Sequence, residues 1–224
     1  SKMPREENAC PVCGGTITMP IVDKRVYLAS RSPRRRELLK QIGVNFELLM
    51  LRSFPESRAD VVETPQPGES PADSAVRLAR KKAEIGWLRS EQRGLRRLPV
   101  MGADTVVALD TSFLGKPTSS VDAAEMLTRL SGREHMVHTA VVMALEERCE
   151  VKLSTTSVRF RELEADEIRN YVSTGEPMDK AGGYAIQGRA ATFIERIDGS
   201  YSGVVGLPLF ETSQLLKLFG FSML

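Results

Sequence analysis

KRVYLASRSPRRRELLKQIG, residues 24–43, joins a run of strand-forming residues directly to a helix-start signal. Its first part, KRVYLAS, is rich in β-formers and predicts a short, buried strand. Ser32 and Pro33 then supply an N-cap and a first helical position, and Gly43 is a helix-stop signal. A strand, a tight turn and a helix in this order indicate an α/β fold.

The rest of the chain continues this alternation and then turns to antiparallel strands. Apolar spacing and turn signals predict strands over 44–51, 98–109, 135–145, 150–160 and 191–197, and helices over 72–92, 121–130, 164–174 and 209–219. Glu146–Arg148 is predicted to close a hairpin, and 198–203 to form a turn. We therefore expect a mixed, twisted sheet flanked by helices. The polar loop over 52–68 and the hairpin leave room for two lobes with a central cleft.

The composition is that of an ordinary globular chain. Of its 224 residues, 42% are hydrophobic and 27% charged, which is enough for a sizeable core in one large domain or two small ones. Lys and Arg number 31 against 29 Asp and Glu, so the net charge of +2 excludes the strongly basic balance of a nucleic-acid coat protein. No apolar run approaches the roughly 18 residues of a spanning helix, and the N-terminus has no signal-peptide core. We expect a soluble, cytoplasmic protein.

Cysteine and histidine offer little for a metal site. Cys10, Cys13 and Cys149 are an odd and sparse count, which does not indicate a disulfide framework. Cys10 and Cys13 resemble half of a zinc ribbon, but no second pair follows at a suitable spacing. His135 and His138 stand three positions apart on a predicted strand, so their side chains point to opposite faces. We favour no structural metal at either pair.

Three consecutive arginines, Arg34, Arg35 and Arg36, fall in the first turn of the predicted helix. The helix macrodipole already places about half a positive charge there, so further cations are locally unfavourable. One interpretation is a solvated basic turn, since arginine has high helix propensity. The other is a site where helix-end N–H groups and guanidinium groups bind a polyanion such as a triphosphate. The strand–turn–helix context favours the second, because departures from local rules often mark functional sites.

Asp104 interrupts an otherwise apolar predicted strand. A carboxylate in that environment is costly unless a metal, a cation or hydrogen bonds compensate it. It is either a structural aspartate satisfied by backbone N–H groups or part of a site at the strand end. The preceding Gly102 and Ala103 leave room for a ligand, which favours the site.

Further charged residues stand beside glycine and proline. Lys82, Lys116, Asp179 and Lys180 are ordinary surface residues if each is taken singly. GKP at 115–117 and MDKAGGY at 178–184 nevertheless place charge in predicted loops, where binding groups concentrate. Additional cations near a phosphate site fit that arrangement.

Several motifs together resemble one family, the Maf family of nucleotide pyrophosphatases. They are ASRSPRRRELL (29–39), GADTVVALD (102–110), GKP (115–117), LSGREHMVHTAV (130–141), EPMDKAGGYAIQG (176–188) and IDGSYSGVVGLPL (197–209). The resemblance runs in order over residues 24–224, which we take as one Maf-like domain. Residues 1–23, with the CxxC pair, form an N-terminal extension outside it.

The resemblance implies a fold related to inosine-triphosphate pyrophosphatases, with a cleft between two lobes. It also implies hydrolysis of a nucleoside triphosphate between the α and β phosphates with a divalent metal, Mg, Mn or Co. By resemblance, Asp104 is the proton acceptor and a metal ligand, and Glu56, in the loop after the second strand, is the other candidate ligand. Arg34, Thr105 and Gln187 match the substrate-selecting positions. The other matched cleft positions are Ser30, Arg35, Lys82, Lys116, Asp179 and Lys180.

Two functions from different classes follow from this resemblance. The chain resembles the family branch that hydrolyses dTTP, UTP and modified pyrimidine triphosphates, in a house-cleaning role, more than the 7-methyl-GTP branch. The alternative is a non-catalytic nucleotide- or RNA-binding regulator linked to cell division. Asp104 favours the enzyme, because a pure binder gains little from a carboxylate that faces phosphates. We expect a nucleoside triphosphate as the partner, with no membrane and no nucleic acid, and we leave a homodimer open.

Overall fold

The computed structural model describes residues 24–53, 55 and 58–223. Cys10, Cys13 and Glu56 lie outside the described residues. The strands are β1 Arg25–Leu28, β2 Asn45–Leu48, β3 Val100–Leu109, β4 Ser112–Leu114, β5 Glu134–Leu145, β6 Arg148–Phe160 and β7 Ile194–Asp198. The α-helices are α1 Pro33–Gln41, α2 Pro71–Gln92, α3 Ser120–Leu130, α4 Ala165–Ser173, α5 Tyr201–Val205 and α6 Leu209–Leu218. Short 3₁₀ helices are η2 Glu176–Asp179, η3 Ala181–Gly183 and η4 Arg189–Phe193.

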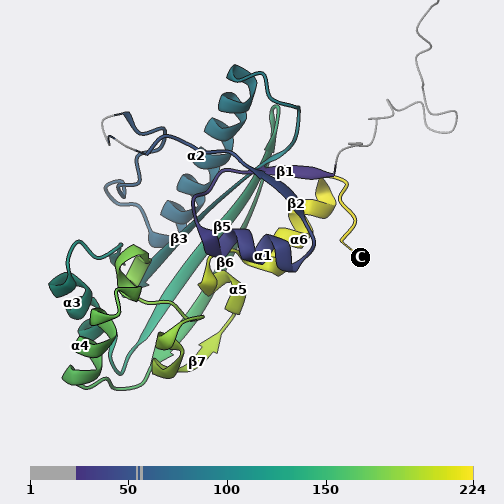
Figure 1. The fold of residues 1–224 in the computed structure, drawn as a ribbon. Coiled ribbons are helices and arrows are strands. Elements are labelled where there is room, and N and C mark those ends of the chain that lie inside the picture. Colours follow the sequence, from purple (N-terminus) through teal and green to yellow (C-terminus); the bar gives the residue numbers. More distant parts are fainter. Residues whose placement is uncertain (1–23, 54, 56–57, 224) are drawn as a thin grey trace, which may run out of the picture.

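The strands form one mixed sheet, as predicted. Its order is β2-β1-β3-β5-β6-β7, with β4 paired to β3. The β2–β1 and β1–β3 pairs are parallel, whereas the β3–β4, β3–β5, β5–β6 and β6–β7 pairs are antiparallel. The long strands β3, β5 and β6 run through the whole molecule, with α1, α2 and α6 near one end and α3 and α4 at the other (Figure 1).

The helix-start signals of the sequence act as predicted. Ser32 caps α1 by accepting a hydrogen bond from the backbone N–H of Arg35, and Ser70 caps α2 by accepting from the N–H of Asp73. A proline occupies the first turn in both helices, where its missing N–H costs nothing. Both Ser-Pro pairs therefore fix where a helix begins after a strand or loop.

Helix α2 covers one face of the sheet through a stripe of small residues. Ala75, Ala79 and Ala83 are buried against alternate residues of β5. At Gly102 on β3 the approach is so close that a Cβ would lie 2.5 Å from the carbonyl oxygen of Ala79. The absence of a side chain at Gly102 therefore lets the helix and the strand meet, which brings the next turn of α2 beside the middle of β3.

The opposite face carries two hydrophobic cores. The core under α1 and α6 is mostly aliphatic, so we call it the aliphatic core; its buried residues include Leu28 and Leu39, and also Phe219. The core under α3 and α4, which we call the aromatic core, contains Phe160 and Tyr184. Two cores along one set of long strands agree with the expected two lobes.

A polar strip separates these cores. Thr105, Thr139 and Ser154 are register partners on β3, β5 and β6, so their side chains lie in one row across the sheet. Along the same face of β3, Ala103 belongs to the aliphatic core and Val107 to the aromatic core. The seam between the lobes is therefore marked by hydroxyl groups instead of aliphatic side chains.

Three sequence predictions near the C-terminal half and β3 need correction. The strand predicted over 191–197 is wrong in its first part, because η4 occupies Arg189–Phe193 and buries Ala190 and Phe193 at a helical spacing. The turn predicted over 198–203 contains the start of α5, capped by Ser200, which accepts from the N–H of Gly203. No strand is predicted at 112–114, but β4 forms there, after a turn in which Asp110 has φ +54°.

Candidate active site

One edge of β3 is open in the middle of the sheet. β1 pairs with β3 only at Val100 and Met101, and β4 joins the same edge only from Val107 onward. Within the described chain, no strand pairs with residues 102–106 on that edge. Ligands of α/β sheets bind beyond the carboxyl ends of parallel strands, where neighbouring strands diverge. The candidate residues gather at this opening.

Lys82 joins two carboxylates on the α2 side of the opening. Its Nζ lies 2.7 Å from Oδ1 of Asp104 and 2.9 Å from Oε1 of Glu63. Asp104 is buried, with 8% of its surface exposed, and the Lys82 side chain is 14% exposed, whereas Glu63 reaches the pair from the solvent side. The ammonium compensates a carboxylate that would be costly to bury alone. Asp104 is thus paired with Lys82 where α2 packs against β3.

Glu63 is the residue that sequence reasoning missed. Burial acts to raise the pKa of Glu63, but the cations of Lys82, Lys116 and Arg35 outweigh it and hold the pKa below its ordinary value. The ligand predicted in this loop is Glu56, which lies outside the described residues. The sequence signal for Glu63 is only its place in the polar loop over 52–68, two residues before Pro65.

The loop that carries Glu63 is fastened to α2. Arg77 donates to the carbonyl of Thr64 at 3.1 Å and to both carboxylate oxygens of Glu69, at 2.5 and 2.9 Å. The Arg77 hydrogen bonds lower the pKa of Glu69 to about 2, so the pair stays charged far into the acid range. The backbone that carries Glu63 is therefore held by Arg77 at the next residue, Thr64.

Arg35 occupies the other side of the opening. Its Nε donates to the carbonyl of Gly206 at 2.7 Å. Its terminal nitrogens donate to Oγ of Ser30 at 3.3 Å and to Oγ1 of Thr105 at 3.2 Å. Burial lowers the pKa of Arg35, and the carboxylates of Asp104 and Glu63 oppose that effect. Arg35 thus links α1, β3 and the segment after α5, with the acidic pair close by.

The hydroxyl of Thr105 has a defined hydrogen-bond direction. Thr139 Oγ1 lies 2.7 Å from the carbonyl of Gly203 and must donate to it, since a carbonyl only accepts. Thr105 Oγ1 lies 3.0 Å from Thr139 Oγ1 and therefore donates its own proton there. The remaining lone pairs of Thr105 accept from Arg35. Toward a ligand, Thr105 acts only as an acceptor or through its methyl group.

Asp104 and Thr105 lie on opposite faces of β3. Asp104 contacts Lys82 on the α2 side, whereas Thr105 contacts Arg35 and Thr139 on the side of the polar strip. Adjacent residues of a strand must alternate in this way. One ligand can contact both residues only across the open edge of β3, because it meets both faces of the strand there.

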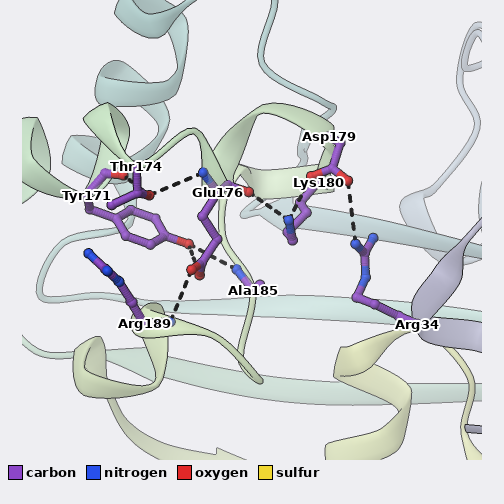
Figure 2. A network of polar contacts seen from close by, with 8 residues as sticks. All are labelled: Arg34, Tyr171, Thr174, Glu176, Asp179, Lys180, Ala185 and Arg189. Carbon is purple, nitrogen blue, oxygen red and sulfur yellow. Dashed lines mark hydrogen bonds and ion pairs between the residues drawn. The ribbon is translucent and has the colours of Figure 1, made fainter. Parts of the chain in front are cut away.

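A third group of charges comes from the segment after α4 (Figure 2). Lys180 Nζ lies 2.7 Å from Oδ1 of Asp179, and Arg34 Nη1 lies 3.8 Å from its Oδ2. Burial acts to raise the pKa of Asp179, yet Lys180 and Arg34 bring it below its ordinary value. The expected cleft residues Arg34, Asp179 and Lys180 are therefore neighbours, although they come from distant parts of the chain.

Two expected site residues make no direct contact with the others. Gln187 is exposed, and within the described residues its side chain forms no hydrogen bond. Lys116 is exposed as well and influences the site through its charge near Glu63. Each is available to a ligand, and neither is fixed by the protein's own polar groups.

Comparison with known proteins identifies the family. A family model described as Maf-like protein matches residues 25–219. The chain belongs to the Maf family. The match confirms the resemblance that the motifs indicated. A Maf relative called dTTP/UTP pyrophosphatase, from Nitrosomonas europaea, is 58% identical over 198 residues, which cover 88% of this chain and 96% of that protein. Another of the same name, from Aromatoleum aromaticum, is 55% identical over 206 residues, covering 92% of this chain and 100% of that one.

The Maf chain also resembles a solved structure. The HAM1 protein from Coxiella burnetii is 17% identical, covers 88% of this chain and 100% of its own, and superposes with a TM-score of 0.47.

The carboxylates of this Maf protein suit a hard divalent cation. Within the described residues no cluster of three or more His, Cys, Asp or Glu side chains is arranged to hold a metal by itself. Glu63 and Asp104 converge on one Lys82 ammonium, which marks a place where positive charge is stabilised by two carboxylates. Mg²⁺ is commonly held by one or two carboxylates together with substrate phosphates and water.

In the described part, no helix is both long and apolar enough to cross a membrane.

Proposed function

We propose that this Maf protein hydrolyses dTTP and UTP between the α and β phosphates, releasing the nucleoside monophosphate and pyrophosphate. The observation that carries the proposal is the Lys82 ammonium shared by Asp104 and Glu63, at the open edge of β3 and beside Arg35. The names of the relatives support the choice of substrates. Modified pyrimidine triphosphates belong to the same class, and their removal is a house-cleaning role for the nucleotide pool.

Cations of this chain bind the triphosphate. Arg35 and Lys82 stand on the two sides of β3's open edge, and Lys116 adds charge near Glu63. Arg34 and Lys180 extend the positive charge along the segment after α4. Fixed cations stabilise the negative charge that builds up as pyrophosphate leaves, because they need no reorganisation during the reaction.

Asp104 acts as the general base. Its carboxylate is buried, held at 2.7 Å by Lys82, and accepts a proton from the attacking water. Lys82 orients this carboxylate through a charge-assisted hydrogen bond. Glu63 faces the same ammonium from the solvent side, so substrate entry meets Glu63 before Asp104.

Asp104 and Glu63 would hold the divalent cation, Mg, Mn or Co, through carboxylate oxygens. When bound, that cation supplies neutralisation of the phosphate charge.

Gln187 selects the base. Its amide both donates and accepts, which suits the carbonyl and N3–H edge of uracil and thymine. Thr105 offers an acceptor or its methyl group, since its proton is used by Thr139. A ligand with the wrong edge leaves polar groups unpaired, at about 1–3 kcal/mol each.

The experiment is pyrophosphate release from a panel of nucleoside triphosphates with Mg²⁺ or Mn²⁺. We expect UTP and dTTP to be hydrolysed well ahead of ATP, GTP and 7-methyl-GTP. Gln187→Glu should depress pyrimidine kcat/KM more than about tenfold. A preference for 7-methyl-GTP would contradict the branch. Nucleotide binding without any pyrophosphate release would support the non-catalytic regulator instead.

A further inference from the structure

The carboxylate of Glu176 fastens the turn that carries Gln187. Its Oε1 accepts from the hydroxyl of Tyr171 at 2.8 Å, and its Oε2 accepts from the backbone N–H of Arg189 at 3.2 Å. The same Tyr171 hydroxyl accepts from the backbone N–H of Ala185 at 3.2 Å. Figure 2 shows this cluster from Tyr171 to Arg189. One carboxylate therefore reaches both ends of residues 185–189, directly at Arg189 and through Tyr171 at Ala185.

Gly188 makes room for this carboxylate. A Cβ at Gly188 would lie 2.3 to 2.7 Å from the carboxylate atoms of Glu176, closer than real Cβ contacts come. The backbone next to Gln187 therefore packs directly on the Glu176 head group. A side chain at position 188 would have to displace it.

The Glu176 carboxylate is hydrogen-bonded to neutral groups. Within the described residues its carboxylate forms no ion pair, and its partners are a hydroxyl and a backbone amide. Burial raises the pKa of Tyr171, and the bond to Glu176 acts in the same direction, so the hydroxyl remains a protonated donor. Hydrogen bonds to a charged acceptor are stronger than neutral ones.

Glu176 also connects this turn with the Lys180 ammonium. Its backbone carbonyl accepts from Lys180 Nζ at 2.7 Å, and Lys180 pairs with Asp179. The turn that carries Gln187 and the Lys180 ammonium are thus both hydrogen-bonded to Glu176. A displacement of Glu176 changes the position of both.

We propose that Glu176 is a positioning residue for base selection, which acts through Gln187. Gln187 has no hydrogen bond of its own within the described residues, so its direction depends on the backbone at 185–189. That backbone is held by Glu176. The inference rests on the proposed function, in which Gln187 reads the uracil or thymine edge.

The test measures binding preference, with substrate analogues that the enzyme cannot cleave. The dissociation constants of uridine and cytidine 5′-(α,β-methylene)triphosphate are compared in the presence of Mg²⁺. In Glu176→Ala the preference for uridine should fall at least about tenfold, equal to about 1.4 kcal/mol. Glu176→Gln should keep most of it, because an amide can still accept from Arg189 and meet the Tyr171 hydroxyl. Gly188→Ala, which displaces the carboxylate, should reproduce the loss.

A double-mutant cycle separates positioning from general stability. In a Gln187→Ala background, Glu176→Ala should leave the remaining preference unchanged, because its effect passes through Gln187. Equal losses in both backgrounds, or an unchanged preference in Glu176→Ala and Gly188→Ala, would overturn the inference. If Glu176→Ala does not fold, Tyr171→Phe and Gly188→Ala serve in the same cycle. A wild-type protein with no uridine preference would contradict the proposed function itself, which is a separate result.

Discussion

The aliphatic and aromatic cores lie on one face of the same long strands, yet they differ in the side chains that they bury. The aliphatic core under α1 and α6 is made of side chains such as Leu39 and Met101. The aromatic core under α3 and α4 contains edge-to-face rings and one buried polar pair, His135 Nε2 with the hydroxyl of Tyr184 at 2.6 Å. Between them, the strip from Thr105 to Ser154 is hydroxyl-bearing and adjoins Arg35.

This difference shows where the sheet can hold charged side chains. Inside either core an unpaired charge would be costly, because neither offers compensating partners. At the seam Arg35 donates to Thr105, and on the opposite face of β3, beside α2, Asp104 accepts from Lys82. The candidate chemistry is therefore located at the open edge of β3, where the seam on one face meets the Lys82–Asp104 pair on the other.

Removal of Lys82 should have the largest effect, because it acts directly at the acidic pair on the α2 side of the open edge. Lys82→Met leaves Asp104 and Glu63 without their shared cation, so we expect kcat/KM for UTP to fall by more than about 100-fold. Lys81→Met is the matched control, since Lys81 is the exposed preceding residue on α2. Equal kcat/KM values for the two variants, measured by pyrophosphate release, would remove Lys82 from the site.

Gly102 tests whether the contact between α2 and β3, beside Asp104, depends on close packing. Gly102→Ala places a Cβ 2.5 Å from the Ala79 carbonyl oxygen and 2.7 Å from the Ala83 nitrogen. We expect the free energy of unfolding to fall by about 1–3 kcal/mol, the usual cost of overpacking. Gly115→Ala is the control, because a Cβ there meets nothing within 4 Å. Urea denaturation of both variants gives the comparison, and equal stability would show that α2 can move away at no cost.

The aromatic core should respond to pH through His135. Burial lowers the pKa of His135 to about 4 from 6.5, so between these values the unfolded chain binds more protons than the folded one. Stability therefore falls as pH falls through that window, by at most about 1.4 kcal/mol per pH unit from this group. His135→Gln should flatten the slope of unfolding free energy against pH.

His138 supplies the control for this pH effect. It is only half-buried and bonds to Thr155 at 2.9 Å, and burial lowers its pKa as well. His138→Gln should therefore flatten the same slope less than His135→Gln does. A larger effect at His138 would contradict the account of the aromatic core.

The polar strip itself should give the smallest change. Thr139→Val removes the partner of Thr105 and the bond to the Gly203 carbonyl, while Arg35 keeps Ser30 and Gly206. We expect about 1 kcal/mol less stability, and a rise of a few-fold in KM for UTP with little change in kcat. Thr155→Val, at an exposed neighbour on β6, is the control. An unchanged KM would mean that the strip does not hold Arg35 in place.

The elements that sequence predicted correctly are those with local signals. Ser32-Pro33 and Ser70-Pro71 mark helix starts because the cap and the first turn are short-range chemistry. Asp104 was recognisable because a carboxylate in an apolar strand requires compensation. The α5 helix was missed, since a short helix that begins in a Gly- and Ser-rich segment has the composition of a turn.

The partners within the site could not be predicted in the same way. Glu63 reaches Lys82 from a proline-rich loop with no periodicity, so only the folded chain brings the two together. The opposite faces of Asp104 and Thr105, by contrast, follow from strand alternation alone. The open edge of β3 depends on where β1 and β4 stop pairing, which is long-range information.

The central claim is that Asp104, held by Lys82 at the open edge of β3, accepts the proton from water as pyrophosphate leaves. The most direct measurement is turnover of UTP with Mg²⁺ by the wild-type protein and by Asp104→Asn, with the released product identified, alongside the affinity for uridine 5′-(α,β-methylene)triphosphate. We predict that the wild type releases pyrophosphate, and that Asp104→Asn loses at least about 100-fold in turnover while it still binds the analogue. Wild-type turnover in Asp104→Asn, or orthophosphate as the first product, would contradict the account.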